Sequence, residues 1–338
     1  MFHSIFSLLD GFVSWLQTLL YVDVVQPVLF KIGMMDYDED TYDALYWVIV
    51  GVLEVFAMCA ILRPLEAFRP AETWKDRKGV RVDVLYTWIV KLGILNLFFF
   101  FTFQPLFDTL QSWLSIHSVP NLEIDNLWPG VTTPLVTFVI YLLILDFAGY
   151  WYHRLEHRFG IWWELHAVHH SQQKMSLWTD DRNHLLDDIL QASFFACVAL
   201  VIGVEPSQFV VLVAITNFMQ SVQHANIRLH FGWLGERIVV SPVFHRRHHA
   251  IGFGHEGTTY SCNFGVLFSF WDILFRSASF DRTVEPTGIR DQLSAPGVAP
   301  VHYGDGFIEQ HWLAFRRIGA RLSSRRAGAS ASDNSAAV

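Results

Sequence analysis

The chain of 338 residues is 52% hydrophobic and only 17% charged, with a mean hydropathy of +0.30. Soluble domains carry roughly 25% charged residues, so the composition favours a membrane protein. The net charge of −8 gives no reason to expect nucleic acid as a partner. The three cysteines are far apart and form no CxxC pair, which argues against both a disulfide framework and a zinc ribbon.

Residues 1–43 are the first predicted region. Residues 2–30 are mostly apolar, but they lack a basic beginning and are interrupted by Asp10 and Asp23. A cleaved signal peptide has a basic start and an unbroken apolar run. We therefore expect an uncleaved membrane helix or a helix in the membrane interface.

Residues 44–130 predict membrane-spanning helices joined by a basic loop. A span takes about 20 mostly apolar residues, and both Ala44–Leu62 and Val84–Phe107 qualify. The segment 63–81 holds six Lys and Arg residues, whereas 108–130 holds none. The positive-inside rule places the first segment in the cytosol and the second outside.

Residues 131–280 contain the histidine-rich part of the chain. Val131–Tyr150 is a further span, which returns the chain to the cytosolic side. Leu190–Gly203 and Phe209–Met219 are shorter and predict a helical hairpin that dips into the bilayer. The histidine clusters therefore all reach the cytosolic face. Residues 281–338 form an extension whose small, polar end predicts disorder from about residue 320.

Eight of the sixteen histidines fall into three tight clusters. On a helix, positions three and four apart share a face, so each cluster can direct two or three ring nitrogens at one spot. Neutral imidazole suits iron, zinc, copper and nickel, and eight ligands exceed what one ion needs. We therefore predict two metal ions side by side. The clusters are His153 and His157; His166, His169 and His170; and His245, His248 and His249.

The motifs around these clusters point to a known family. Asp146–His157 reads DFAGYWYHRLEH, Trp163–Ser171 reads WELHAVHHS, and Ser241–His249 reads SPVFHRRHH. With NFGVLFSFWDILF at Asn263–Phe275, the chain resembles the fatty acid hydroxylase/sterol desaturase superfamily of membrane di-metal oxygenases over about Leu142–Phe275. The expected fold is an all-α, multi-pass membrane bundle with a cytosolic helical cap that carries a histidine-rich di-metal site.

The resemblance implies a non-haem di-iron centre held by the eight clustered histidines. Members add further histidines between the second and third clusters, and His184 and His224 match by position, with His230 as a rival to His224. His255, in an insert after the third cluster, is a weaker candidate. Zinc can replace the two iron ions on purification, because it binds more tightly than ferrous iron. The remaining histidines are expected to be ordinary surface residues: His3, His117, His302 and His311.

Metal-bound histidines usually donate their other ring N–H to a carboxylate or a carbonyl. Asp146 is the strongest candidate for such a catalytic supporting role, because a carboxylate near the end of an apolar helix is costly without a partner. The alternative is a helix-end carboxylate in water. Asp272, Asn226 and Asn263 are expected to be structural. The other candidate carboxylates are Glu156, Glu164, Asp180, Asp187 and Asp188.

The resemblance implies an O2-dependent oxygenase that hydroxylates, or desaturates, a C–H bond of a lipid such as a sterol, a fatty acyl lipid or a carotenoid. Hydroxylation is the favoured outcome. The electron donor is expected to be a separate protein, either cytochrome b5-like or ferredoxin-like. A bacterial inner membrane is favoured as the location, and the ER membrane if the chain is eukaryotic.

Two other interpretations stay open. One is a non-catalytic, lipid-binding member of the superfamily. The other is a histidine-rich metal transporter, which would place its ligands near the middle of the bilayer. Trp47, Phe98–Phe101 and Phe138 are candidates to line a substrate route, although core or lipid packing is their default interpretation. Arg276-Ser277 replaces the usual Gly-Thr of the family, which weakens assignment to one subfamily.

Overall fold

The computed structural model describes residues 2–94, 109–110, 112–118, 133–203, 206–251, 261–294, 296–297 and 299–335. Within these ranges the chain forms helices joined by turns and loops, with three isolated β-bridges and no strand. The predicted all-α fold is confirmed. Four described helices are long and apolar enough to cross a membrane: Gly11–Ile32, Met35–Phe68, Leu135–Arg158 and Leu185–Ile202.

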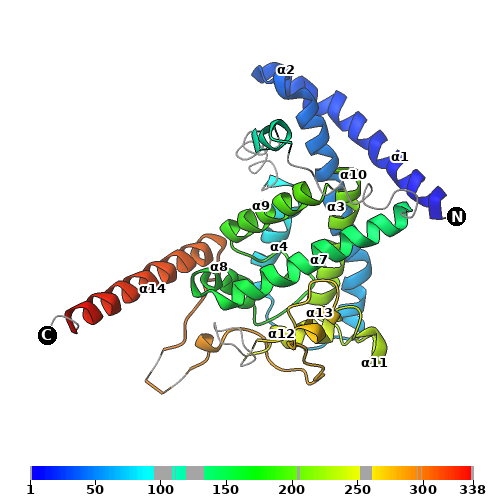
Figure 1. Ribbon diagram of the computed structural model, residues 1–338. Coiled ribbons are helices and arrows are strands. Elements are labelled where there is room, and N and C mark those ends of the chain that lie inside the picture. The colour runs from blue at the N-terminus through cyan, green and yellow to red at the C-terminus, as the bar shows by residue number, and fades with distance from the viewer. Residues whose placement is uncertain are drawn as a thin grey trace.

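Figure 1 shows the helices in place. In chain order they are α1 (Phe2–Leu20), a π-helical turn η1 (Tyr21–Val25), α2 (Gln26–Ile32), a short 3-10 turn η2 (Met35–Tyr37), α3 (Asp38–Phe68), α4 (Lys78–Lys91), α7 (Pro134–Arg158), α8 (Gly160–His170), α9 (Leu185–Ile202), α10 (Pro206–His224), α11 (Gly232–Gly235), α12 (Pro242–His248), α13 (Phe270–Leu274), a 3-10 turn η3 (Arg290–Gln292) and α14 (Phe307–Ser335).

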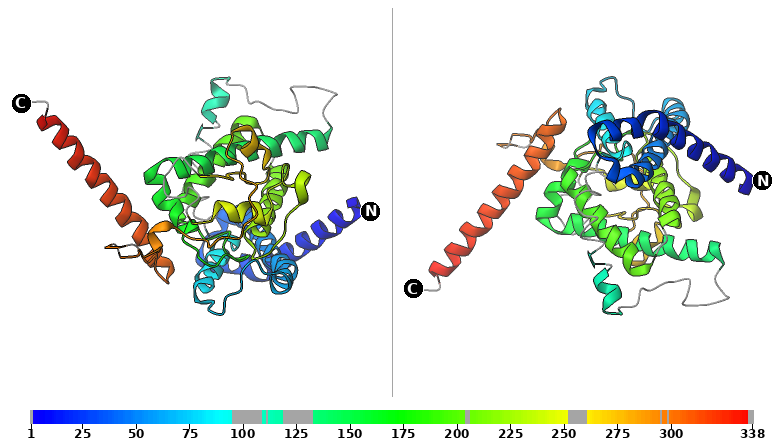
Figure 2. Two further views of the ribbon diagram at one scale, coloured as in Figure 1. Left: turned by 90° about the horizontal axis from the view of Figure 1, so that it is seen from below. Right: turned by 90° about the horizontal axis from the view of Figure 1, so that it is seen from above.

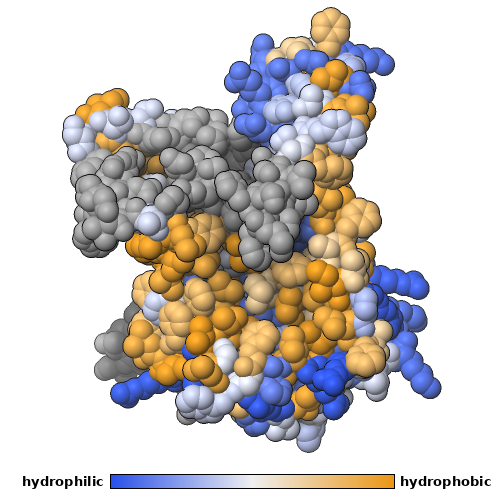
Figure 3. All heavy atoms as spheres, turned by 90° about the vertical axis from the view of Figure 1, so that its right-hand side faces the viewer, coloured by the Kyte–Doolittle hydropathy of each residue, from blue (hydrophilic) through white to orange (hydrophobic). Residues whose placement is uncertain are grey.

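The central helices pack around α7. It contacts α8, α9 and α10, while α12 lies against α10 and α3 lies against α4 and α10. The helices α1 and α14 reach outward from this bundle in different directions (Figure 2). Hydrophobic side chains gather in a broad band on the face drawn in Figure 3, with hydrophilic side chains below the band and at the upper end. An apolar belt between two polar zones is what a bilayer requires of a spanning bundle.

The predicted spans correspond to observed helices where the structure describes them. Ala44–Leu62 lies inside α3, Val131–Tyr150 falls mostly within α7, and the short pair near Glu205 forms α9 and α10. Only the beginning of the predicted span Val84–Phe107 is described, as the end of α4. Residues 95–108 lie outside the described residues, and so does the candidate route Phe98–Phe101.

The C-terminal extension differs from the sequence prediction. Irregular chain was expected from about residue 320, but α14 continues to Ser335. The helix is held on α8 by ion pairs from Arg317 and Arg321 to the buried carboxylate of Glu164. Arginine and alanine favour a helix once its first turns are anchored, so the small residues after Arg321 continue it.

The helices α3 and α4 meet at Gly51. A Cβ atom built on Gly51 would lie 2.0 Å from the backbone oxygen of Lys91. This close approach sets the end of α4 against α3, where Lys91 Nζ lies 3.1 Å from Glu54 of α3 and 3.7 Å from Asp181. The buried ammonium thus ties both helices to the loop before α9.

We predict that Gly51→Ala destabilises the protein. The new methyl group must push backbone against backbone, and overpacking of this kind costs about 1–3 kcal/mol. The measurement is the thermal unfolding midpoint in detergent. Gly11→Ala is the matched control, because its Cβ meets nothing within 4 Å. Equal midpoints for the two variants would contradict the tight contact.

Candidate metal centre

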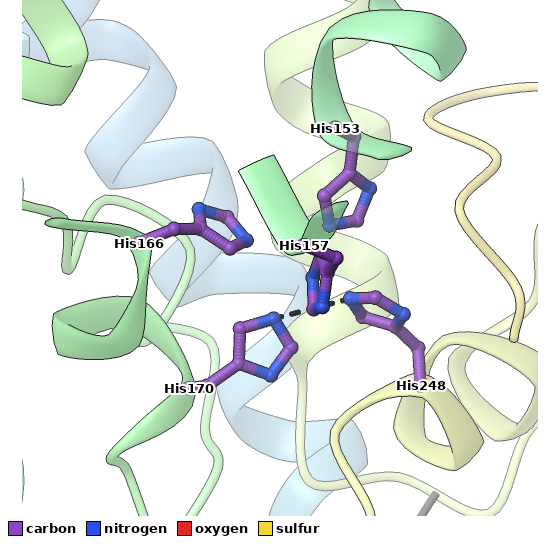
Figure 4. Close-up of side chains that lie close together, drawn as sticks. All are labelled: His153, His157, His166, His170 and His248. Atoms are coloured by element: carbon purple, nitrogen blue, oxygen red, sulfur yellow. Dashed lines mark hydrogen bonds between the residues drawn. The ribbon is translucent and has the colours of Figure 1, made fainter. Parts of the chain in front are cut away.

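Nine histidines converge in two neighbouring groups. The ligand atoms within each group lie within 4.8 Å of one another, and all nine side chains are buried. Figure 4 shows the rings of the first group turned toward a common centre. The first group is His153 and His157 from α7, His166 and His170 from α8, and His248 from α12; the second is His169 from α8, His224 from α10, and His245 and His249 from α12 and its end.

The two groups lie side by side because α8 contributes to both. His166 and His170, one turn apart, face the first group, while His169 faces the second. The rings of His170 and His249 stack across the boundary with centroids 4.3 Å apart. At α12, Ser241 caps the helix by accepting from Phe244 N, which starts the short turn that directs the third cluster inward.

Backbone carbonyls fix the outer nitrogen of four of these rings. A carbonyl oxygen only accepts, so the facing Nδ1 must carry the hydrogen and Nε2 must carry a lone pair. The distances from Nδ1 to oxygen are 3.0 Å for His153 to Phe264, 3.0 Å for His169 to Arg182, 2.8 Å for His224 to Gln220 and 2.7 Å for His248 to Cys262.

The inner nitrogens are arranged for a cation. Nε2 of His169 and Nε2 of His224 are 3.1 Å apart. Since both rings donate through Nδ1, both inner nitrogens present lone pairs, and no hydrogen lies between them. Nε2 of His153 is buried with no hydrogen-bond partner. Buried acceptors without donors are costly, and a metal ion between them removes that cost.

Burial also keeps these rings neutral. It lowers the pKa of His169, His170, His245 and His249 well below the usual value, and the neighbouring histidines lower it further. Neutral imidazole is the form that binds a metal. An all-imidazole donor set of this kind fits a first-row divalent ion such as iron or zinc.

Carboxylates stand behind two of the rings. Nδ1 of His166 lies 3.5 Å from both Glu156 and Asp187. Nδ1 of His224 lies 3.2 Å from Asp180, whose other oxygen accepts from Ser221. Glu164, the remaining candidate near the second cluster, pairs instead with the arginines of α14.

The structure gives Asp146 partners other than the expected histidine. Its oxygens accept from the backbone N–H groups of Leu267 and Phe268 and from the indole N–H of Trp271. The outer nitrogen of His153, seven residues on, is held by Phe264 instead. Asp146 therefore anchors the segment that supplies this carbonyl.

The three residues expected to be structural make backbone contacts. Asp272 accepts from Phe264 N and Gly265 N, and both Asn226 and Asn263 bond to backbone groups.

His184 lies apart from both groups. Its Nδ1 caps α9 by accepting from Leu186 N, and its ring packs on His311 of α14 with centroids 4.4 Å apart. Of the two further candidates, His184 and His224, only His224 joins the eight clustered histidines. His230 is exposed and accepts from Gly232 N. His255 lies outside the described residues.

A buried ion pair that the sequence analysis missed supports the second group. The guanidinium of Arg182 lies 2.8 Å from Asp83 of α4 and also donates to the carbonyl of Val168. This pairing fixes the backbone at Arg182, whose own carbonyl orients His169. The one sequence signal was an aspartate at the start of a predicted span, where an unpaired charge is costly.

A cavity of about 720 Å3 leads to the histidines. One helical face of α7, from Leu142 through Leu145 and Gly149 to His153, forms one wall. Phe195 of α9 and Val213 of α10 add apolar surface. Trp47 lines the cavity and so departs from the default interpretation of core or lipid packing, whereas Phe138 follows it and packs in the core beside Tyr141.

Comparison with known proteins gives a consistent assignment. Residues 138–277 match the family described as fatty acid hydroxylase. The chain is 28% identical to the ornithine lipid hydroxylase OlsE of Rhizobium tropici over 68% of this chain and 66% of that protein. It is 30% identical to the alkylglycerol monooxygenase of Homo sapiens over 46% of this chain and 32% of that protein.

A sterol desaturase is also similar. The Delta(7)-sterol 5(6)-desaturase ERG3B of Gibberella zeae is 24% identical over 46% of this chain and 45% of its own length. The chain thus spans just under two thirds of the ornithine lipid hydroxylase and less than half of the other two relatives. No solved structure matches.

These matches confirm the resemblance read from the histidine motifs. The match to the fatty acid hydroxylase family covers residues 138–277, which hold all three histidine clusters, in a chain with four described helices long and apolar enough to cross a membrane. The relatives named above are a hydroxylase, a monooxygenase and a desaturase.

We predict that each histidine group holds its own metal ion. His248→Ala and His169→Ala should each lower the metal content of purified protein from about two ions per chain to about one, because each removes a ligand from a different group. Elemental analysis measures this. His302→Ala is the control, since its side chain is 76% exposed and outside both groups. Unchanged metal content in either cluster variant would remove that residue from the ligand set.

We further predict that Asp180→Asn weakens metal binding about 10–100-fold, the usual effect of losing a carboxylate behind a ligating histidine. The carboxylate faces the outer nitrogen of His224. Competition with a chelator of known affinity measures the change. Asp305→Asn, at a carboxylate that is 94% exposed, should leave the affinity unchanged.

Proposed function

We propose that this protein is an O2-dependent, di-iron membrane oxygenase that hydroxylates a C–H bond of a lipid. The observation that carries the proposal is the pair of buried histidine groups beside a cavity with apolar and acidic walls, with the lone pairs of His169 and His224 facing each other. Two iron ions held there would supply activation of O2. The proposed ligands are the nine clustered histidines, without His184.

The residues around the site bind the substrate. Apolar side chains of α7, α9 and α10 hold the hydrocarbon part of the substrate and exclude water. One oxygen atom of O2 enters the product and the other leaves as water, which takes two electrons and two protons. A separate donor protein, cytochrome b5-like or ferredoxin-like, supplies the electrons.

The contacts of the basic loop support a cytosolic site. Glu66, within the basic segment 63–81, accepts from Leu177 N and Asn226 N. Glu72 in the loop pairs with Arg246 of the third cluster. Loop and metal centre therefore share one face of the bundle, and the positive-inside rule assigns that face to the cytosol. A bacterial inner membrane remains the favoured location.

Two features favour catalysis over the alternatives. All eight histidines of the three motifs are present and converge. A transporter would need ligands near the bilayer midplane, whereas these groups lie beside the basic loop. A lipid-binding protein without catalysis would not need nine oriented imidazoles. Desaturation uses the same centre, and we place it second.

The test is a turnover assay. Detergent-purified protein is loaded anaerobically with ferrous iron, mixed with membrane lipids and a chemical reductant, and exposed to O2. We expect products that have gained one oxygen atom and O2 uptake that His169→Ala abolishes. Products that have lost two hydrogen atoms would assign a desaturase. Metal binding without lipid oxidation would favour the non-catalytic alternative.

A further inference from the structure

The wall of the cavity is acidic. None of the described residues that line it is Lys or Arg, although the cavity reaches both histidine groups. A lipid phosphate or carboxylate would meet no cation there except a bound metal. Seven carboxylates line it: Asp40, Asp43, Asp146, Glu156, Asp180, Asp181 and Asp188.

Most of these carboxylates already have partners. Asp146 accepts three N–H groups, and Asp180 faces His224 and accepts from Ser221. Asp181 pairs with Lys91, and Glu156 faces His166. Asp40 and Asp43 are exposed at the beginning of α3. Asp188 differs from the other buried carboxylates, since among the described residues its one hydrogen-bond donor is the amide of Asn183.

Asp188 forms a polar pair with Asn183. The amide nitrogen of Asn183 donates to one oxygen of Asp188 at 2.9 Å. That bond fixes the amide orientation, because a carboxylate oxygen accepts. The other oxygen of Asp188 and the amide oxygen of Asn183 are buried without hydrogen-bond partners, and the Asn183 side chain is 9% exposed. Both residues line the cavity, and each has one buried acceptor without a partner.

A second amide repeats this arrangement. Gln223 is 1% exposed and also lines the cavity. Its amide nitrogen donates to the carbonyl of Val266 at 2.7 Å, which leaves its amide oxygen as a buried acceptor without a partner. Each unpaired buried acceptor costs about 1–3 kcal/mol. Asn183, Asp188 and Gln223 therefore each leave one buried acceptor without a donor.

We propose that the Asn183–Asp188 pair binds the protonated amine of an amine-bearing lipid and so selects this class of substrate. An ammonium group brings three donors and one positive charge, which match the open acceptors and the carboxylate of Asp188. A hydroxyl brings one donor and no charge, and a phosphate or carboxylate brings more acceptors. The inference rests on the proposed function of the same cavity.

The pair also lies next to the metal centre along the chain. Asn183 follows Arg182, whose carbonyl orients His169, and Asp188 follows Asp187, whose carboxylate faces His166. The amine end of the lipid would thus be held close to the histidines. The apolar part of the α7 face that lines the cavity, about 10 Å from Leu142 to Gly149 by the helical rise, takes part of the hydrocarbon chain. The carbon oxidised is then one near the polar end.

The test uses binding, so that it does not depend on turnover. Zinc-loaded full-length protein in neutral detergent is titrated with oleylamine, oleyl alcohol and oleate, three probes with the same chain and different ends. We expect wild-type protein to bind oleylamine at least about ten-fold more tightly than the other two. Equal or tighter binding of oleate or oleyl alcohol would overturn the proposal.

Variants locate the effect at Asp188. Asp188→Asn should weaken oleylamine binding about ten-fold and leave oleyl alcohol within about two-fold, whereas Asp188→Glu should restore part of the preference. Asp305→Asn is the control. Partitioning of each probe into micelles is the same for all variants, so it cancels when the affinities of variants for one probe are compared. An unchanged preference in Asp188→Asn would overturn the assignment. If that variant does not fold, the wild-type comparison decides.

The result separates this inference from the proposed oxygenase. Selective amine binding without O2-dependent oxidation of any lipid would support the amine site and overturn the proposed function. Oxidation of neutral or anionic lipids with no amine preference would overturn the inference alone.

Discussion

The structure depends on one constraint: the inner nitrogens of His169 and His224 face each other as hydrogen-bond acceptors. Neutral imidazoles that present acceptors to each other at 3.1 Å repel unless a cation lies between them. Five of the nine rings have a carbonyl or a carboxylate behind them. Carbonyls hold His153, His169, His224 and His248, and carboxylates stand behind His166 and also behind His224, so the surrounding structure orients these ligands.

The buried charges of the bundle serve that backbone. Asp146 and Asp272 both hold the segment Phe264–Phe268, which supplies the carbonyl behind His153. Arg182 is fixed by Asp83 and offers its own carbonyl to His169. A charge inside a membrane helix is costly unless it is paired. Here each pairing places one loop, and each loop orients one histidine, so the polar interior and the metal centre stabilise each other.

The cavity combines two chemistries with separate consequences. Its apolar stripe along α7 accepts any hydrocarbon of suitable length and so contributes little selectivity. Its inner end presents acceptors from Asn183, Asp188 and Gln223. Hydrogen-bonding groups discriminate between ligands more sharply than apolar surface, because a mismatch leaves a buried group unpaired. In the proposed function the histidines thus set the reaction type, and the wall beside them sets the substrate class.

Sequence alone determined the parts that depend on local spacing. The intervals between the clustered histidines predicted shared helix faces, because a helix repeats about every 3.6 residues. The number of clustered histidines predicted two metal ions, and the apolar stretches predicted membrane-spanning helices. Tertiary structure decided which partners meet across the chain. His169 and His170 are neighbours in sequence but face different groups, Asp146 reaches Leu267 121 residues away, and His184 packs on α14. Such pairings depend on how α7, α8 and α12 pack, and the spacing of residues along one helix does not predict that packing.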